Sequence, residues 1–223
     1  MSYVSASSNG KNSTSVLYVA DDGSKLIRQG GSRAWRNNNP GNMRHTKFSR
    51  YHGAIGSAGG FAVFPDRQTG RAALSALLQV PSYASLSIFS AISKYAPPQE
   101  NDTDKYQKQI GKLTGLDIKR KLGDLKNNEI ESVVNAIQII ESYVVGTEKS
   151  VRKIIGAQTD GKRLTAFLIE GDSAYIPVST AIRLAGHGEI DAVIVRPSRG
   201  EAYLRATADA ATKNNFSAIA TPA

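Results

Sequence analysis

The sequence predicts an α+β chain, with a mainly α-helical first domain followed by a small β-α-β-β domain. After Ser150 the strand-like RLTAFLIEG, the helix-like PVSTAIRLAGHG and two further strand-like runs indicate a separate α/β unit. Before Ser150, apolar residues recur at the spacing of amphipathic helices. The clearest helical stripe consists of Ile130, Val133, Val134, Ile137, Ile140 and Val144.

These patterns divide the chain into consecutive parts. Residues 1–32 are rich in Ser, Asn and Gly and are interpreted as a polar tail with a short strand or hairpin near Asp22-Gly23. Residues 33–150 form the helical domain, and residues 162–223 form the small α/β domain. For the last helix of the first domain, Asn128 is the expected N-cap and Glu131 the third helical residue.

The composition excludes several kinds of site. The 223 residues include no Cys and three His, so disulfides, thiolate metal sites and a His-rich metal centre are not expected, and no cofactor is predicted. No apolar run approaches the roughly 18–20 residues that cross a bilayer. The first residues lack the apolar stretch of a secretory signal. We therefore expect synthesis in the cytoplasm, no membrane span, and delivery by another route if the protein acts elsewhere.

The positive charge lies mainly in the first half. The formal net charge is +9, and up to Gln99 eleven Lys or Arg face only three acids. Such a balance suits a polyanionic partner, either nucleic acid or an anionic bacterial wall. Nucleic acid is disfavoured because no Lys/Arg-rich helix and no interleaved aromatic platform occurs.

The stretch RAWRNNNPGNMRH, residues 33–45, combines a sharp turn with many amides. Asn39-Pro40-Gly41-Asn42 predicts a β-turn, in which Pro40 fixes φ and Gly41 supplies a positive φ. A turn needs only these residues. The remaining amides and arginines therefore indicate a surface that hydrogen-bonds a polar ligand.

Glu100 is the candidate proton donor. It is the first glutamate of the chain and lies in APPQENDTDKY, on a loop that two prolines stiffen. Aromatic neighbours such as Tyr95 and Tyr106 favour the protonated form of such a carboxyl group. Asp102 is a nearby second carboxylate and also a candidate N-cap. Capping of the next helix is the alternative role for this whole stretch.

RNNNPGNMR, GFAVFPDRQTGRAAL and YAPPQENDTDKY, in this order, resemble motifs of phage-virion and secreted bacterial peptidoglycan-degrading enzymes. These enzymes are lytic transglycosylases or muramidases of the phage structural-protein-P5 type. The likeness covers about residues 33–146 and implies a lysozyme-like fold. The asparagine-rich turn is also similar to a motif of bacterial glucosaminidases, in which a catalytic glutamate precedes the turn. No glutamate precedes it here, which directs the assignment to Glu100.

Two further stretches carry resemblances. Glu141-Ser142 ends the longest apolar helix, and a Glu-Ser pair at a helix end is the catalytic signature of many soluble lytic transglycosylases. Glu141 is thus the second candidate for the catalytic acid, with a structural helix end as the alternative. SRGEAYLRATADAATKNNFSAI resembles the end of a small bacterial domain family of unknown function, which implies a docking or adaptor role at most.

The resemblance implies a glycan ligand for the turn. Amides would bond N-acetyl and hydroxyl groups, an aromatic ring would stack on a sugar face, and arginines would meet wall carboxylates. The side chains expected in these roles, together with the aromatic neighbours of Glu100, are Asn37, Asn38, Asn39, Asn42, Trp35, Tyr51, Arg36, Arg44, Tyr95 and Tyr106. The alternative is that the asparagines satisfy one another and the nearby backbone.

The expected activity is cleavage of the peptidoglycan glycan strand between N-acetylmuramic acid and N-acetylglucosamine. Glu100 would protonate the glycosidic oxygen. The partners implied are peptidoglycan, a phage particle or secretion machine that brings an antibacterial effector to the periplasm or cell wall, and an immunity protein. The alternative is a non-catalytic module that binds the wall or another polyanion.

Overall fold

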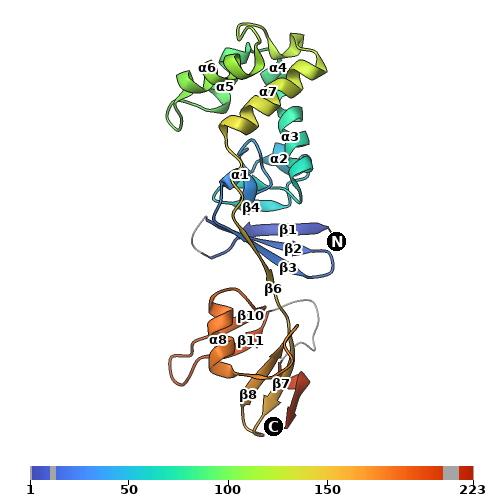
Figure 1. The fold of residues 1–223 in the computed structure, drawn as a ribbon, viewed down its shortest axis with the longest axis vertical. Coiled ribbons are helices and arrows are strands. Elements are labelled where there is room, and N and C mark those ends of the chain that lie inside the picture. The colour runs from blue at the N-terminus through green and yellow to red at the C-terminus, as the bar shows by residue number, and fades with distance from the viewer. Residues whose placement is uncertain (1, 11–13, 208–215, 223) are drawn as a thin grey trace. The chain divides into compact units, whose positions relative to one another are not determined.

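Strands, not a tail, occupy the first part of the chain. The computed structural model describes residues 2–10, 14–207 and 216–222. Strands β1 (Tyr3–Ser8), β2 (Ser15–Ala20) and β3 (Lys25–Gln29) belong to a six-stranded sheet with the order β5-β4-β1-β2-β3-β6 (Figure 1). β1 pairs antiparallel with β2 and parallel with β4 (Gly56–Ala58). The interpretation of residues 1–32 as a polar tail is therefore wrong, whereas the short strand or hairpin expected near Asp22-Gly23 is confirmed, because β2 and β3 are neighbours in the sheet on either side of it.

Alternating burial explains why this segment forms a sheet. Val16, Tyr18 and Ala20 of β2 are at most 2% exposed, and the phenol of Tyr18 donates to the carbonyl oxygen of Arg36 at 2.6 Å. The close approach of β1 to β4 requires Gly56, because a Cβ atom there would lie 1.8 Å from the Ala6 carbonyl oxygen. The expected strand or hairpin covers β2, whereas the approach of β1 to β4 has no local signal in the sequence.

The chain divides into two compact units. Unit 1 comprises Met1–Gly23 and Arg28–Glu148, and unit 2 comprises Ser24–Ile27 and Lys149–Ala223. The two end strands of the large sheet are β5 (Phe61–Val63), with three residues, and β6 (Thr147–Val151), with five.

The helices of unit 1 lie between β3 and β6 in the sequence, with β4 and β5 inserted after the second helix. They are α1 (Arg33–Arg36), α2 (Lys47–Tyr51), α3 (Arg67–Gln79), α4 (Pro81–Ala84), α5 (Ile88–Tyr95), α6 (Thr103–Thr114) and α7 (Asn127–Ile140), with a 3₁₀ turn η1 (Leu122–Asp124). The apolar faces of α3 to α7 and of η1, together with Met43, Ala62 and Phe64, form one hydrophobic core.

The predicted stripe of the last helix is largely confirmed. Its members from Ile130 to Ile137 are buried in α7 and Ile140 is partly buried, whereas Val144 lies beyond the helix and is 56% exposed. The predicted N-cap is wrong, because α7 begins two residues earlier, with Lys126 as N-cap.

Unit 2 contains more strands than the β-α-β-β prediction. A four-stranded sheet has the order β12-β7-β8-β9, and β10 pairs antiparallel with β11. The elements are β7 (Ile154–Thr159), β8 (Leu164–Ile169), β9 (Ile176–Pro177), α8 (Val178–Gly186), β10 (Ala192–Val195), β11 (Tyr203–Ala206), η2 (Phe216–Ile219) and β12 (Ala220–Pro222). Part of the C-terminal stretch quoted above, residues 208–215, lies outside the described residues.

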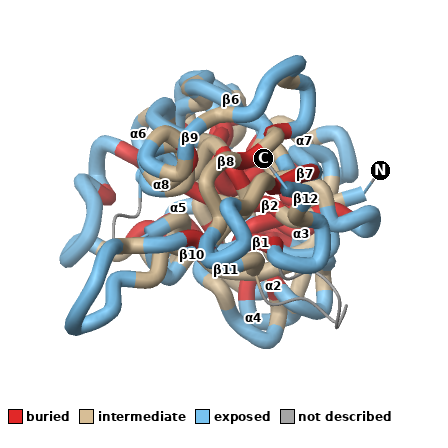
Figure 2. The backbone as a smooth tube through the Cα atoms, turned by 90° about the horizontal axis from the view of Figure 1, so that it is seen from below, coloured by how far each residue is buried: buried red, intermediate tan, exposed pale blue. Residues whose placement is uncertain are grey.

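The expectation of a mainly α-helical, lysozyme-like first domain followed by a β-α-β-β domain is wrong, because both parts of the chain contain more strands than expected. Roughly 36% of the structure is helical and 28% is strand. Within the described residues, twelve strands form three sheets and the eight α-helices are short. Buried segments, red in Figure 2, include strands such as β7 and β8 as well as helices. None of the helices found in the described part of the chain has the length and apolar character needed to cross a membrane.

Candidate active site

The asparagine-rich stretch forms a tight, self-bonded turn. The Asn42 amide N–H donates to the carbonyl oxygen of Asn39 at 2.9 Å, which confirms the predicted β-turn. The positive φ belongs to Asn42, at +49°, and not to Gly41. Gly41 is needed for another reason, because a Cβ atom there would lie 2.5 Å from the hydroxyl oxygen of Tyr95.

Three of the asparagines are buried, and their side-chain amides form hydrogen bonds with backbone groups. Asn39 is 0% exposed, and its Nδ2 donates to the carbonyl oxygens of Met43 and Ala62 at 2.9 Å each. Nδ2 of Asn37 also donates to the Ala62 carbonyl, and Nδ2 of Asn38 donates to the Phe64 and Pro65 carbonyls. The expectation that Asn37, Asn38 and Asn39 bind glycan is therefore wrong. Their amides satisfy backbone carbonyl groups of Met43 and of residues 62–65.

Three other residues expected to contact glycan do not line the cleft described next. Trp35 is 4% exposed and packs beneath the Arg28 guanidinium. Arg36 is buried and donates to the carbonyl oxygens of Gly30 and Gly31. Tyr51 is 88% exposed and lines no part of the cleft described next. The expected ligand contacts of the buried Trp35 and Arg36 are corrected accordingly, and that of the exposed Tyr51 stays a prediction.

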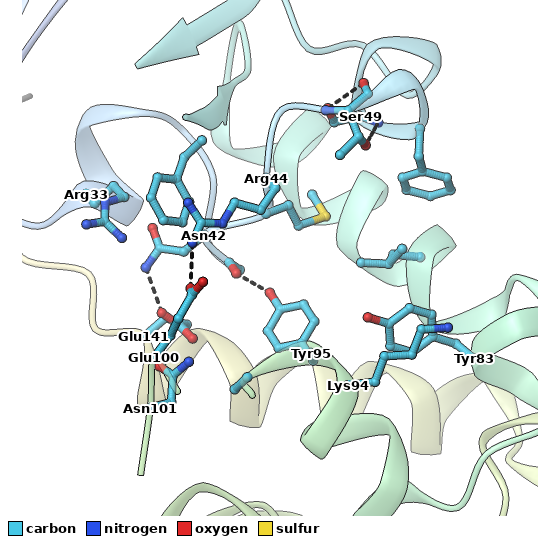
Figure 3. Close-up of a pocket in the computed structure, with 17 residues that line it drawn as sticks. Arg33, Asn42, Arg44, Ser49, Tyr83, Lys94, Tyr95, Glu100, Asn101 and Glu141 are labelled. Atoms are coloured by element: carbon cyan, nitrogen blue, oxygen red, sulfur yellow. Dashed lines mark hydrogen bonds and ion pairs between the residues drawn. The ribbon is translucent and has the colours of Figure 1, made fainter. Parts of the chain in front are cut away.

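A cleft of about 340 Å³ opens beside the turn (Figure 3). Its walls come from α1, the turn, α2, β5, α3, α4, α5, the loop before α6, and the end of α7. The lining residues are Arg33, Gly41, Asn42, Met43, Arg44, Thr46, Phe48, Ser49, Phe61, Leu77, Tyr83, Lys94, Tyr95, Ala96, Glu100, Asn101 and Glu141.

Glu141 is the most firmly positioned acid of the cleft. Its Oε2 accepts from Nδ2 of Asn42 at 2.6 Å, and its Oε1 accepts from the hydroxyl of Tyr106 at 2.9 Å. Glu141 is the C-cap of α7. The next residue, Ser142, has the unusual φ of +60°. A positive φ at a residue other than glycine is a backbone strain that often occurs at functional sites.

Tyr95 and Tyr106 are buried donors behind the acid. Burial raises the pKa of Tyr106 well above the usual range for tyrosine, and the neighbouring Tyr95 and Glu141 raise it further. Burial likewise raises the pKa of Tyr95, whose hydroxyl donates to the carbonyl oxygen of Gly41. Both phenols therefore remain protonated at neutral pH, and that of Tyr106 can donate to a carboxylate. They support the turn and Glu141 instead of flanking Glu100.

Glu100 lies in the same cleft but in a different setting. Its Oε2 pairs with Nη2 of Arg44 at 2.5 Å, and both side chains are more than half exposed. Asp102 lines no part of this cleft. Its carboxylate caps α6 by accepting the Lys105 amide N–H at 3.1 Å. The catalytic role predicted for Asp102 is thus replaced by the capping alternative.

The cleft carries three cations, Arg33, Arg44 and Lys94, against the two carboxylates. The guanidinium carbons of Arg33 and Arg44 lie 3.9 Å and 4.3 Å from the ring centroid of Phe61. This stacking positions two positive charges at one wall. Arg33 and Phe61 fall inside quoted motifs, but no pattern singled them out, and Lys94 had no signal at all.

Comparison with known proteins adds one match. Residues 149–217 match a family described as "Protein of unknown function (DUF3892)". No curated protein and no solved structure matches the chain. The family match covers residues of unit 2 and includes none of the cleft residues.

Proposed function

We propose that unit 1 cleaves the glycan strand of bacterial peptidoglycan between N-acetylmuramic acid and N-acetylglucosamine, with Glu141 as the proton donor. The observation that carries this proposal is the carboxyl group of Glu141, held at both oxygens by Asn42 and Tyr106 at the wall of an open cleft. The motif resemblance of residues 33–146 supports the choice of substrate.

The chemistry needs an acid next to the bond that breaks. Glycoside cleavage passes through an oxocarbenium-like transition state and uses a carboxylic acid to protonate the leaving oxygen. Such a donor must be held within hydrogen-bonding reach of that oxygen. Glu141 is partly buried and anchored on a helix end, whereas Glu100 is 56% exposed on a loop and contacts a guanidinium group. These settings favour Glu141 as the donor.

The second carboxylate bears on the type of product. A lytic transglycosylase reuses its one acid as a base, so that the muramyl 6-hydroxyl closes a 1,6-anhydro ring. A hydrolase uses a second carboxylate to assist water or the oxocarbenium ion. In the part of the chain that the structure describes, Glu100 is the second acid of the cleft. Mass spectrometry of the products distinguishes the two reactions, because a transglycosylase leaves 1,6-anhydro ends and a hydrolase leaves reducing ends.

A non-catalytic, wall-binding module is the second candidate. The observation that favours it is the excess of cations at the cleft, which suits the carboxylates of peptidoglycan. Purified peptidoglycan separates the candidates. Released soluble muropeptides indicate an enzyme, and co-sedimentation without release indicates a binder.

Single substitutions test the assignment of the acid. Glu141→Gln keeps the shape of the side chain but removes the proton, and general acid catalysis is worth about 10²–10⁴-fold. We expect muropeptide release to fall at least about a hundredfold, with wall binding unchanged. Glu131→Gln, on the same helix and paired with Arg71 outside the cleft, is the control and retains full activity.

Glu100→Gln completes the comparison. We expect a loss of about tenfold or less, because it removes a charge of the cleft but not the donor. Loss of release in Glu100→Gln with an active Glu141→Gln would instead make Glu100 the acid. Activity in both variants would contradict glycoside cleavage in this cleft.

A further inference from the structure

The cleft continues past Glu141 along α6. A neighbouring hollow of about 310 Å³ shares Asn101 and Glu141 with the cleft. A third hollow, of about 340 Å³, shares Asp102, Lys105 and Gln109 with the second. Successive hollows therefore adjoin one another through shared lining residues, and this run of three hollows in unit 1 is called the groove. The second and third hollows together are called the α6 arm.

Lysines dominate the outer half of the α6 arm. Lys105, Lys108 and Lys112 are spaced by three and four residues, which places them on one face of the helix. They extend along about 10 Å of helix axis. All three are exposed, and none of the ion pairs found between described residues involves them.

The acids of the arm serve the helix itself. Asp102 accepts the Lys105 amide N–H as N-cap, and Asp104 lies in the first turn, where the helix dipole favours a negative charge. The amide side chains of Asn101 and Gln109 complete the lining. The arm therefore presents three ammonium groups and two amides beside the carboxylates of Asp102, Asp104 and Glu141. Two of its ammonium groups, those of Lys108 and Lys112, lie toward the outer end, and these and the amides suit a ligand bearing carboxylates and N-acetyl groups.

We infer that the groove binds a long, peptide-bearing glycan strand on both sides of Glu141, with the α6 arm as an additional binding site for its anionic units. The inference rests on the proposed function and refines it. Glu141 lies where the cleft and the arm meet, so the scissile bond lies within the bound strand and not at its end. The enzyme is accordingly endo-acting.

Strand length is the variable that tests this inference. The substrates are purified uncrosslinked glycan strands with stem peptides, either long or cut to a peptide-bearing tetrasaccharide. The test variant is the full chain with Lys108→Ala and Lys112→Ala. Lys119→Ala with Lys121→Ala removes the same charge from exposed residues that line no part of the groove, and is the matched control.

We expect the test variant to lose kcat/KM on long strands, mainly through a higher KM. Two exposed charge contacts are together worth a factor of about two to thirty. The tetrasaccharide, which does not fill both sides of the groove, is cleaved as by the wild type, and the control variant changes neither rate. Early products of the wild type from long strands are internal fragments of mixed length.

Equal losses on both substrates, or no loss on long strands, would overturn the inference. Release of only the smallest product from the start would also overturn it. Binding by Glu141→Gln protein separates this inference from the proposed function. If the wild type cleaves neither substrate, the proposed function fails. A preference of that protein for long strands that disappears with the lysines then still supports the groove, and equal binding of both lengths refutes it.

Discussion

At the residue scale, the two asparagines that flank Pro40-Gly41 have different surroundings. Asn39 is fully buried. Its Nδ2 donates to the carbonyl oxygen of Met43, and its Oδ1 accepts the amide N–H of the same residue. Asn42 is partly exposed at the cleft, and its Nδ2 meets Glu141. The same residue type thus has a structural role in one position and contacts the candidate acid in the other.

Substitution of each asparagine separates these roles. Asn39→Ala leaves buried backbone groups without partners, each costing about 1–3 kcal/mol. We expect the free energy of unfolding of unit 1 to fall by about 2 kcal/mol or more in chemical denaturation. Asn42→Gly removes the donor to Glu141 while glycine accepts the positive φ without strain. We expect muropeptide release to fall about tenfold or more, with stability changed by less than about 1 kcal/mol. Full activity in Asn42→Gly would show that this contact is dispensable.

At the element scale, the start of α7 depends on a carboxylate that periodicity did not identify. Glu129 accepts the Lys126 amide N–H at 2.8 Å and pairs through both oxygens with Arg120, at 2.6 and 3.0 Å. The Arg120 hydrogen bonds, followed by the Lys126 backbone bond, lower the pKa of Glu129 to about 2, from a usual 4.5.

This pKa predicts an acid-dependent contribution to stability. A carboxyl group whose folded-state pKa is depressed stabilises the fold above its unfolded pKa and loses that contribution as the pH falls through the folded value. Glu129→Gln should therefore lower the melting temperature of unit 1 at pH 7. The difference from wild type should shrink below about pH 4.5 and vanish near pH 2. A difference that stays constant with pH would exclude the ionised pair as its cause.

At the scale of the whole molecule, two separate hydrophobic cores predict two unfolding transitions. One core belongs to the helices of unit 1, and the other gathers Phe167, Phe216 and their neighbours in unit 2. Phe167 is 1% exposed, and its ring centroid lies 5.3 Å from that of Phe216.

Phe167→Ala tests this independence. A large-to-small change of a buried aromatic residue costs about 3–5 kcal/mol. In calorimetry we expect it to lower the transition of unit 2 alone and to leave muropeptide release unchanged. Ile137→Ala, at a fully buried position of α7, should lower only the other transition. A single transition that both substitutions shift would contradict two cooperative units.

The sequence by itself determined the local elements of this protein. The helical stripe of α7 and the β-turn at Pro40-Gly41 follow from periodicity and turn chemistry, because each records the burial or the backbone angles of its own few residues. Composition likewise excluded disulfides, and the residues that line the cleft include two of the three acids predicted from sequence, Glu100 and Glu141.

The tertiary structure decided which residues meet. Asn42 and Glu141 are 99 positions apart, and Arg44 and Glu100 are 56 apart, so no local pattern reports either contact. The parallel pairing of β1 with β4 is equally remote, and it turned a presumed tail into part of a sheet. Burial distinguishes Asn39, which is fully buried, from Asn42 at the cleft. It also distinguishes Glu141, which is partly buried, from Glu100, whose side chain is 56% exposed. The physical reason is that a side chain's role depends on the neighbours that packing brings to it, and these come from distant parts of the chain.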